Sequence, residues 1–229
     1  MNARTLKGAS VLLFDFGGTL DSDGIPWKAR FFRIWKDEAG EIAPAAFDRA
    51  FYDADDAVVG RVAAETPLAE TVGRVARGLV EGIRHAADEP LAEKIAARFL
   101  ADARERLSSS AVLLKRLAGR YRLGIVSNFY GNLGAVCRES GIAPYLSVAI
   151  DSAAVGFRKP DARIFEAAFA PLDCRPSDAI FVGDSLPRDM AGARAVGMPH
   201  VWLSTEETPC CCPEDPVIRS LGDLEEILA

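Results

Sequence analysis

Five polar side chains follow short apolar stretches of the sequence or lie between them, and their chemical types could work together. Asp15, Ser127 and Asp184 each come just after such a stretch. Asp189 follows shortly after Asp184, and Lys159 lies between the stretches that precede Ser127 and Asp184. Carboxylates, a hydroxyl and a lysine are groups found in catalytic and cation-binding sites, but each one alone is common in loops. Their value depends on the elements that hold them.

The apolar stretches predict the strands of a parallel sheet. They do not alternate polar and apolar residues, which is typical of strands covered by helices on both faces. The stretches between them carry apolar residues at helical spacing. Strand and helix alternate, so the sequence predicts an α/β, Rossmann-like core. The predicted strands are 11–14, 123–126, 148–150, 179–182 and 200–203; the predicted helices are 111–119, 133–141, 163–170 and 190–196.

The segment between the first and second predicted strands contains no strand pattern and is too long for one crossover. It predicts four helices, at 27–38, 44–58, 67–85 and 90–107. We therefore expect an inserted all-helical subdomain over residues 22–108 and a core formed by residues 1–21 and 109–229. Residues 215–229 predict a last short strand and helix of that core.

This arrangement would gather the five polar side chains. In an open parallel sheet, ligands bind beyond the carboxyl ends of the strands. Asp15, Ser127 and Asp184 stand at such ends, so we expect two carboxylate sites, a hydroxyl and the lysine to meet on one edge.

The order and context of these residues resemble the haloacid dehalogenase (HAD) superfamily along nearly the whole chain. The motifs that carry the resemblance are residues 15–20 (DFGGTL), the strand-end Ser127, residues 156–160 (GFRKP), and residues 183–189 (GDSLPRD) followed by Ala-Gly-Ala. The resemblance implies a Rossmann-like core. It also implies that the helical insert is the cap of one large branch of the family.

The resemblance further implies a Mg²⁺-dependent phosphohydrolase that acts on a small phosphorylated metabolite. Asp15 would attack phosphorus and form an aspartyl-phosphate, since an ionised carboxylate needs no base to activate it. Repulsion between this anion and the phosphate would be relieved by Mg²⁺, held by Asp15, Asp184 and the backbone carbonyl of Gly17.

The remaining motif residues would bind and stabilise the phosphoryl group. Lys159 would supply positive charge, and Ser127 would donate a hydrogen bond to a phosphoryl oxygen. Backbone N–H groups around Phe16 and Asn128 would complete the phosphate site. Asp189 would orient Lys159 or hold the water shell of the metal.

One residue departs from the family's phosphatase pattern, because position 17 is Gly where those enzymes have a second Asp. That Asp protonates the leaving group and then activates water, which is worth about 10²–10⁴-fold. Asp21 or Asp23 could replace it, although exposed turn carboxylates are the favoured interpretation. Alternatively, the substrate could have a good leaving group that departs without a proton.

Two other interpretations stay open. Dehalogenases and phosphonatases of the superfamily also lack the second Asp. Dehalogenases use no metal, however, and typically lack the first acid of the fourth motif, so the presence of both Asp184 and Asp189 argues against them. A phosphonatase would need a Schiff-base lysine from the cap, for which Lys28 and Lys36 are available. The last interpretation is a catalytically weakened protein that binds a metabolite or a partner.

The first helix of the insert could contribute to substrate choice. Arginine and tryptophan near a site suit a further anionic or ring-bearing group, but core packing is the favoured interpretation at this spacing. The residues concerned are Trp27, Lys28, Arg30, Phe31, Arg33 and Trp35.

Composition limits the partners. The chain has 229 residues, is 49% hydrophobic and carries a net charge of −6, which argues against a general nucleic-acid binder. No apolar run approaches the ~20 residues of a membrane helix, and no signal peptide is evident. The five cysteines are not spaced as a disulfide framework, which fits a reducing cytoplasm. The consecutive Cys210, Cys211 and Cys212 have poor geometry for joint metal binding. We expect a monomer or homodimer.

Overall fold

A six-stranded parallel sheet forms the centre of the molecule. The computed structural model describes residues 6, 8–205 and 215–229. The strands are β1 (Val11–Phe14), β2 (Arg122–Ser127), β3 (Leu146–Asp151), β4 (Ala179–Gly183), β5 (His200–Leu203) and β6 (Val217–Ile218), in the order β3-β2-β1-β4-β5-β6. Every neighbouring pair is parallel. The predicted Rossmann-like sheet is confirmed.

Strand β1 shows why the stretches are apolar throughout. All four of its residues are fully buried. Leu12 and Phe14 pack into a cluster on one face of the sheet, whereas Val11 and Leu13 pack into a second cluster on the other face. Because both faces are covered by helices, no position of the strand is left for a polar side chain.

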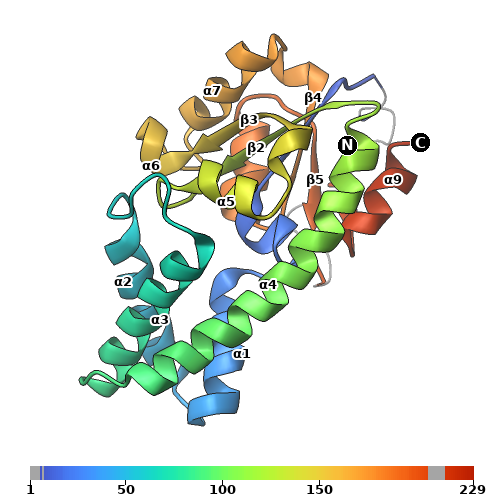
Figure 1. The fold of residues 1–229 in the computed structure, drawn as a ribbon. Helices are drawn as coiled ribbons and strands as arrows, with labels where there is room; N and C mark the ends of the chain where they lie inside the picture. The colour runs from blue at the N-terminus through green and yellow to red at the C-terminus, as the bar shows by residue number, and fades with distance from the viewer. Residues whose placement is uncertain (1–5, 7, 206–214) are drawn as a thin grey trace.

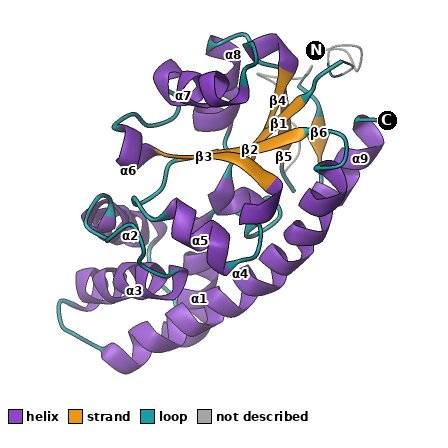
Figure 2. Ribbon diagram, turned by 45° about the horizontal axis from the view of Figure 1, so that its top comes forward, coloured by secondary structure: helices purple, strands orange, loops and turns teal. Residues whose placement is uncertain are grey.

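Helices cover both faces of this sheet. Figure 2 shows α7 (Ala162–Leu172) and α8 (Ala191–Ala195) on one face, with α5 (Leu133–Glu139) and the end of α4 (Glu89–Leu117) on the other. The short α6 (Ser152–Val155) follows β3, and α9 (Leu224–Ile227) lies near the C-terminus. Between β1 and β4 the crossovers turn in opposite directions, and such a switch point is where α/β sheets bind ligands.

The predicted helical insert is present between β1 and β2. It consists of α1 (Trp27–Ala39), α2 (Pro44–Val58), α3 (Leu68–Arg84) and the first part of α4, and it extends away from the sheet in Figure 1. We call this group of helices the cap. Its apolar residues form one continuous cluster with those under the α5 face of the sheet.

One prediction about the cap was wrong. The sequence predicted separate helices at 90–107 and 111–119, but α4 is a single helix over both. The three serines at 108–110, which lie between the two predicted helices, are all part of α4. Ser110 is buried, and its hydroxyl donates to the carbonyl oxygen of Leu20 at 2.7 Å. The helix therefore ties the cap to the loop after β1. The exact limits of the cap stay a prediction.

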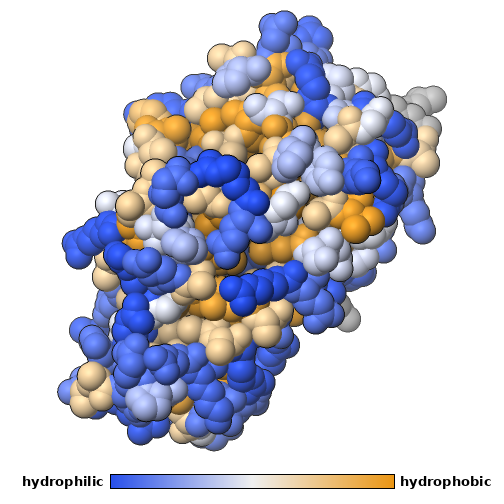
Figure 3. Space-filling model, viewed as in Figure 1, coloured by the Kyte–Doolittle hydropathy of each residue, from blue (hydrophilic) through white to orange (hydrophobic). Residues whose placement is uncertain are grey.

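Hydrophilic residues cover most of the far end of the cap on the face seen in Figure 3, whereas apolar residues gather over the sheet half and near the junction. In the part of the chain that the structure describes, no helix is long and apolar enough to cross a membrane. The consecutive Cys210, Cys211 and Cys212 lie outside the described residues.

Candidate active site

Asp15 lies directly beyond the end of β1, at the switch point of the sheet. Its side chain is almost buried, with 7% of the residue exposed. Carboxylate oxygen Oδ1 accepts hydrogen bonds from the Phe16 N–H at 2.8 Å and the Ser127 hydroxyl at 2.7 Å. Oxygen Oδ2 has no hydrogen bond within the described ranges and is free to react or to bind a cation.

Lys159 reaches this carboxylate from the loop between α6 and α7. Its buried ammonium nitrogen lies 2.7 Å from Oδ1 of Asp15 and 2.7 Å from Oδ1 of Asp189. Burial alone would lower the pKa of Lys159, but attraction from the two carboxylates outweighs it and the pKa is raised. The lysine therefore stays positively charged at neutral pH.

Asn128 fixes the backbone that carries this lysine. Its side-chain oxygen accepts from the Lys159 N–H at 2.7 Å, and its side-chain nitrogen donates to the Lys159 carbonyl at 3.1 Å. Both bonds use the side chain of Asn128, whereas the sequence predicted a role for its backbone N–H. Asn128 thus positions Lys159 beside Asp15.

Asp184 follows β4 and points into the same space. Its Oδ1 accepts from the Thr19 hydroxyl at 3.0 Å, while its buried Oδ2 has no partner among the described residues. Burial, followed by repulsion from Asp189 and Asp15, raises the pKa of Asp184 well above its usual range. A buried carboxylate oxygen with no donor, beside two other acids, is in a position that a cation would stabilise.

Asp189 is bound more completely than Asp184. One of its oxygens faces Lys159, and the other accepts from the Ser185 N–H at 2.9 Å. Burial raises its pKa, although Lys159 opposes this effect. The contacts fit the predicted role of orienting Lys159 better than that of a direct metal ligand.

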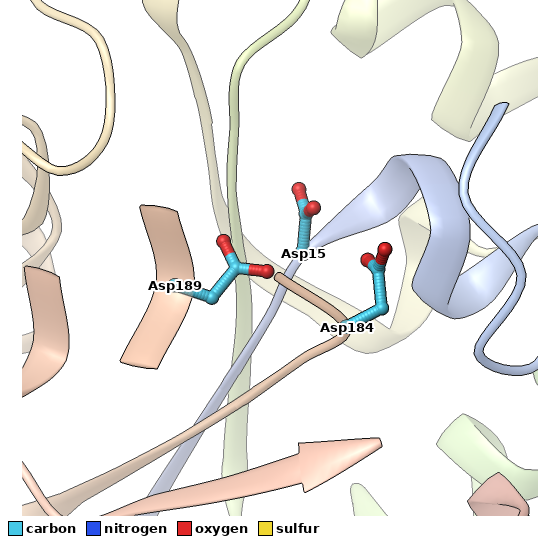
Figure 4. A group of neighbouring side chains, drawn as sticks. All are labelled: Asp15, Asp184 and Asp189. Atoms are coloured by element: carbon cyan, nitrogen blue, oxygen red, sulfur yellow. The ribbon is translucent and has the colours of Figure 1, made fainter. Parts of the chain in front are cut away.

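The three acids lie close together, and two of them, Asp15 and Asp184, keep an oxygen without a hydrogen-bond donor among the described residues that a divalent cation could bind. One oxygen from each of Asp15, Asp184 and Asp189 lies within 4.8 Å of the others, and Figure 4 shows the three carboxylates gathered beyond the ends of β1 and β4. Magnesium prefers such oxygen ligands. Gly18 makes the approach possible, because its φ is 94° and an added Cβ would lie 2.4 Å from Asp184.

A cavity of about 240 Å³ opens beside Asp15, between the core and the cap. Gly17, Asn128 and Lys159 line it from the core together with Asp15. Phe16 does not line it; the ring packs edge-on against Phe129 at 5.2 Å. The cap and neighbouring loops contribute aromatic and charged side chains, among them Trp27, Lys28, Tyr52, Asp55, Tyr130 and Arg188.

The two acids considered as replacements for the missing Asp are both engaged elsewhere. Asp21 is fully buried and accepts from the Gly18 N–H at 2.8 Å, the Trp27 indole at 2.6 Å and Arg30 at 2.9 Å. Asp23 accepts from the Leu221 N–H at 2.6 Å. Neither lines the cavity. The favoured interpretation, exposed turn carboxylates, was right that neither acid reaches the site but wrong on exposure: Asp21 is buried, and the Asp23 side chain is 25% exposed.

Some side chains of the first cap helix, α1, face the cavity and others face the apolar core. Trp27 and Lys28 line the cavity, whereas Arg30, Phe31 and Trp35 are buried. Packing is thus the main role of this helix, as the spacing favoured. Arg33 lies on the outside, where it pairs with Asp102 at 3.1 Å.

Sequence reasoning missed four polar residues of the cavity: Tyr52, Asp55, Tyr130 and Arg188. Asp55 is one of four aspartates in α2 and has no motif around it. Tyr130 lies two residues after Asn128, and Arg188 lies inside the segment 184–189, so proximity to motif residues was the available signal for these two.

The fold and the candidate site together define a class of protein with a Rossmann-like core, an aspartate at the switch point of the sheet and a helical cap. The family model described as haloacid dehalogenase-like hydrolase matches residues 9–197. The chain belongs to this family, and the resemblance drawn from the motifs is confirmed.

Individual relatives are more distant. A phosphoserine phosphatase of Thermus thermophilus is 32% identical over 129 residues, which cover 56% of this chain and 47% of the relative. The chain spans about half the length of the curated relatives it matches first.

Two solved structures share the fold over nearly their whole lengths. The HAD-hydrolase YfnB of Bacillus subtilis, bound to magnesium, has a TM-score of 0.61 at 24% identity, covering 97% of this chain and 99% of that one. A dehalogenase with an intermediate complex has a TM-score of 0.67 at 18% identity, covering 97% and 98%. At these identities the likeness is one of fold.

Proposed function

We propose that the protein is a Mg²⁺-dependent phosphohydrolase that acts on a small phosphorylated metabolite through an aspartyl-phosphate on Asp15. The observation that carries this proposal is the position of the Asp15 carboxylate. It lies 2.7 Å from the buried ammonium of Lys159 and within 4.8 Å of the oxygens of Asp184 and Asp189. A phosphatase-named relative supports the phosphoryl substrate.

The metal would be held by Asp15, Asp184 and the backbone carbonyl of Gly17. The orphaned oxygen of Asp184 and its raised pKa support this assignment. When bound, Mg²⁺ supplies positive charge that reduces repulsion between the nucleophile and the phosphate. Asp189, which is already bound by Lys159 and Ser185, would act outside the direct ligand set.

The chain's own residues prepare the attack. Ser127 and the Phe16 N–H hold Oδ1 of Asp15, which orients Oδ2 as the attacking atom. Lys159, whose raised pKa keeps it protonated at neutral pH, lies beside this carboxylate and would stabilise the negative charge of the transferring phosphoryl group. On substrate binding, the Ser127 hydroxyl would turn its hydrogen bond toward a phosphoryl oxygen.

The cavity supports a small anionic substrate. Lys28, Arg158, Lys159 and Arg188 all line it, so its walls carry more positive than negative side chains. A volume of about 240 Å³ suits a small metabolite rather than a polymer. Cytoplasmic location, the absence of nucleic-acid and membrane partners, and a monomeric or homodimeric state stay part of the proposal.

The phosphonatase interpretation loses support from the lysines of the cap. Lys28 pairs with Asp48 at 2.9 Å, and this hydrogen bond raises its pKa. A protonated amine is a poor Schiff-base nucleophile. Lys36 does not line the cavity; its ammonium lies over the Phe32 ring at 5.4 Å.

The proposal is tested by phosphate release from acetyl phosphate and ribose 5-phosphate, each with Mg²⁺ and with a chelator. We expect release from at least acetyl phosphate, and only with Mg²⁺. Release that survives chelation would contradict the metal assignment. If neither substrate releases phosphate, halide release from a haloacid in the presence of chelator would favour a dehalogenase instead.

A further inference from the structure

In this protein Trp27 crowds the position at which the family's phosphatases carry their acid. A Cβ added to Gly17 would lie 3.1 Å from the indole nitrogen of Trp27 and 3.4 Å from its Cδ1. The indole is itself fixed, because it donates to Asp21 at 2.6 Å and packs edge-on against Phe99 with a ring distance of 4.8 Å. Hydrolysis of an alkyl phosphate therefore needs a proton from another residue.

Asp55 of α2 lies on the cap side of the cavity that Asp15 lines from the core. The Tyr130 hydroxyl donates to its Oδ1 at 2.5 Å. Its Oδ2 has no hydrogen bond or ion pair within residues 8–205 and 215–229. Apart from Asp15, Asp55 is the carboxylate that lines this cavity among the described residues.

We propose that Asp55 is the general acid and base of this enzyme, held by Tyr130 and delivered by the cap in place of the missing aspartate at position 17. The inference rests on the proposed phosphohydrolase function and deepens it. With this acid, the enzyme could hydrolyse substrates with poor leaving groups, such as alkyl and sugar phosphates.

The surroundings of Asp55 suit a carboxyl group that carries a proton. Burial raises its pKa, and its neighbour Asp56 adds to this effect. Tyr130, Arg158 and Arg188 act in the opposite direction without cancelling it. Arg188 lines the same cavity, where burial lowers the pKa of its guanidinium, but attraction from three acids outweighs burial and raises that pKa: Asp15, Asp189 and Asp184.

The same residue can serve both half-reactions. In the first, Oδ2 of Asp15 bonds to phosphorus, the bond from phosphorus to the leaving oxygen breaks, and the proton of Asp55 passes to that oxygen. In the second, water attacks phosphorus from the side the leaving group has vacated, gives its proton to Asp55 and displaces the Asp15 carboxylate. Inorganic phosphate leaves, and Asp55 is protonated again.

The experiment is rapid-quench measurement of phospho-enzyme formation in the wild type and in Asp55→Asn, with acetyl phosphate, glycerol 3-phosphate and ribose 5-phosphate. The acetate of acetyl phosphate departs without a proton. We therefore expect Asp55→Asn to form phospho-enzyme from acetyl phosphate at the wild-type rate and to accumulate it. The first step with the alkyl phosphates should slow about 10²–10⁴-fold.

Asp53→Asn is the matched control, because Asp53 lies on the same helix with 77% of its side chain exposed. It should behave as the wild type with all substrates. The inference would be overturned if Asp55→Asn changed the rate of phospho-enzyme formation by the same factor with acetyl phosphate and with the alkyl phosphates. It would also be overturned if the wild type formed phospho-enzyme from acetyl phosphate alone. A wild type that forms no phospho-enzyme from any substrate would overturn the proposed function itself.

Discussion

The indole nitrogen of Trp27 stands 3.1 Å from the point where a side chain on Gly17 would begin. The family's second aspartate is replaced by Gly17, and a tryptophan of the cap lies in the space that the side chain of such an acid would need. Trp27 also connects the cavity to the motif loop, since it lines the cavity and donates a hydrogen bond to Asp21 of that loop.

The first prediction concerns moving the acid back to position 17. In an Asp55→Asn background, Gly17→Asp alone should restore little activity on ribose 5-phosphate, because Trp27 crowds the new carboxyl group. Adding Trp27→Phe removes the indole nitrogen and keeps an aromatic ring against Phe99. Steady-state phosphate release should then recover at least about tenfold, part of what general acid catalysis provides.

Gly17→Ala with Trp27→Phe is the control for relief of crowding without a carboxyl group, and it should give no recovery. Full recovery with Gly17→Asp alone would show that Trp27 does not exclude an acid from this position.

The second prediction concerns the pH dependence set by Tyr130. As an acid, Asp55 must be protonated, so the rate on an alkyl phosphate falls as the pH rises through the Asp55 pKa. The Tyr130 hydrogen bond lowers that pKa. Tyr130→Phe should therefore raise it and move the alkaline limb of the kcat profile to higher pH.

With acetyl phosphate, the pH dependence of the rate of phospho-enzyme formation should be the same in Tyr130→Phe as in the wild type. Tyr145→Phe, a change in a tyrosine that does not line the cavity, controls for loss of a phenol elsewhere. A shift of the limb to lower pH in Tyr130→Phe would contradict the assigned hydrogen bond.

The third prediction concerns the buried ion pair between the motif loop and the cap. Arg30 and Asp21 lie 2.9 Å apart with side-chain exposures of 2% and 0%, and Arg30 also donates to the Phe99 carbonyl at 3.1 Å. Arg30→Met leaves Asp21 buried without its cation. It should lower the free energy of unfolding by about 3–5 kcal/mol in denaturant titrations at neutral pH.

Arg33→Met, on the same helix, is the control, because its pair with Asp102 is about half exposed and should contribute less than about 1 kcal/mol. Burial already raises the pKa of Asp21, and loss of Arg30 raises it further. A raised carboxyl pKa costs stability above that pKa and not below the unfolded value. The deficit of Arg30→Met should therefore shrink as the pH falls, and Asp21→Asn should relieve it.

The sheet and the convergence of the candidate site residues on one edge were predictable because their signals are local. Strand β1 is apolar at every position and ends at Asp15, so its burial on both faces and its polar end could be inferred without coordinates. The same holds for Asp184 and Ser127, since parallel strands bring their carboxyl ends to one edge. Lys159 was assigned from its motif context, because it lies in a loop where no periodic pattern could predict its position.

The course of α4 and the cap side of the cavity were not predictable in this way. Ser110 favours a helix end by its type, but its hydrogen bond to Leu20 comes from residues 90 positions away. Asp55 lies on the face of α2 that lines the cavity, whereas Asp53 and Asp56 lie on other faces of the same helix. Which face lines the cavity depends on how α2 packs, which the apolar pattern of α2 constrains only loosely.

The most direct test of the account is whether Asp15 carries the phosphoryl group. Wild type and Asp15→Asn are incubated with acetyl phosphate and Mg²⁺, quenched in acid, digested and analysed by mass spectrometry, with phosphate release followed in parallel. The account predicts a phosphorylated peptide containing Asp15 in the wild type, and neither phosphopeptide nor release in Asp15→Asn. Sustained release by Asp15→Asn, or a phosphoryl group on another residue, would contradict it.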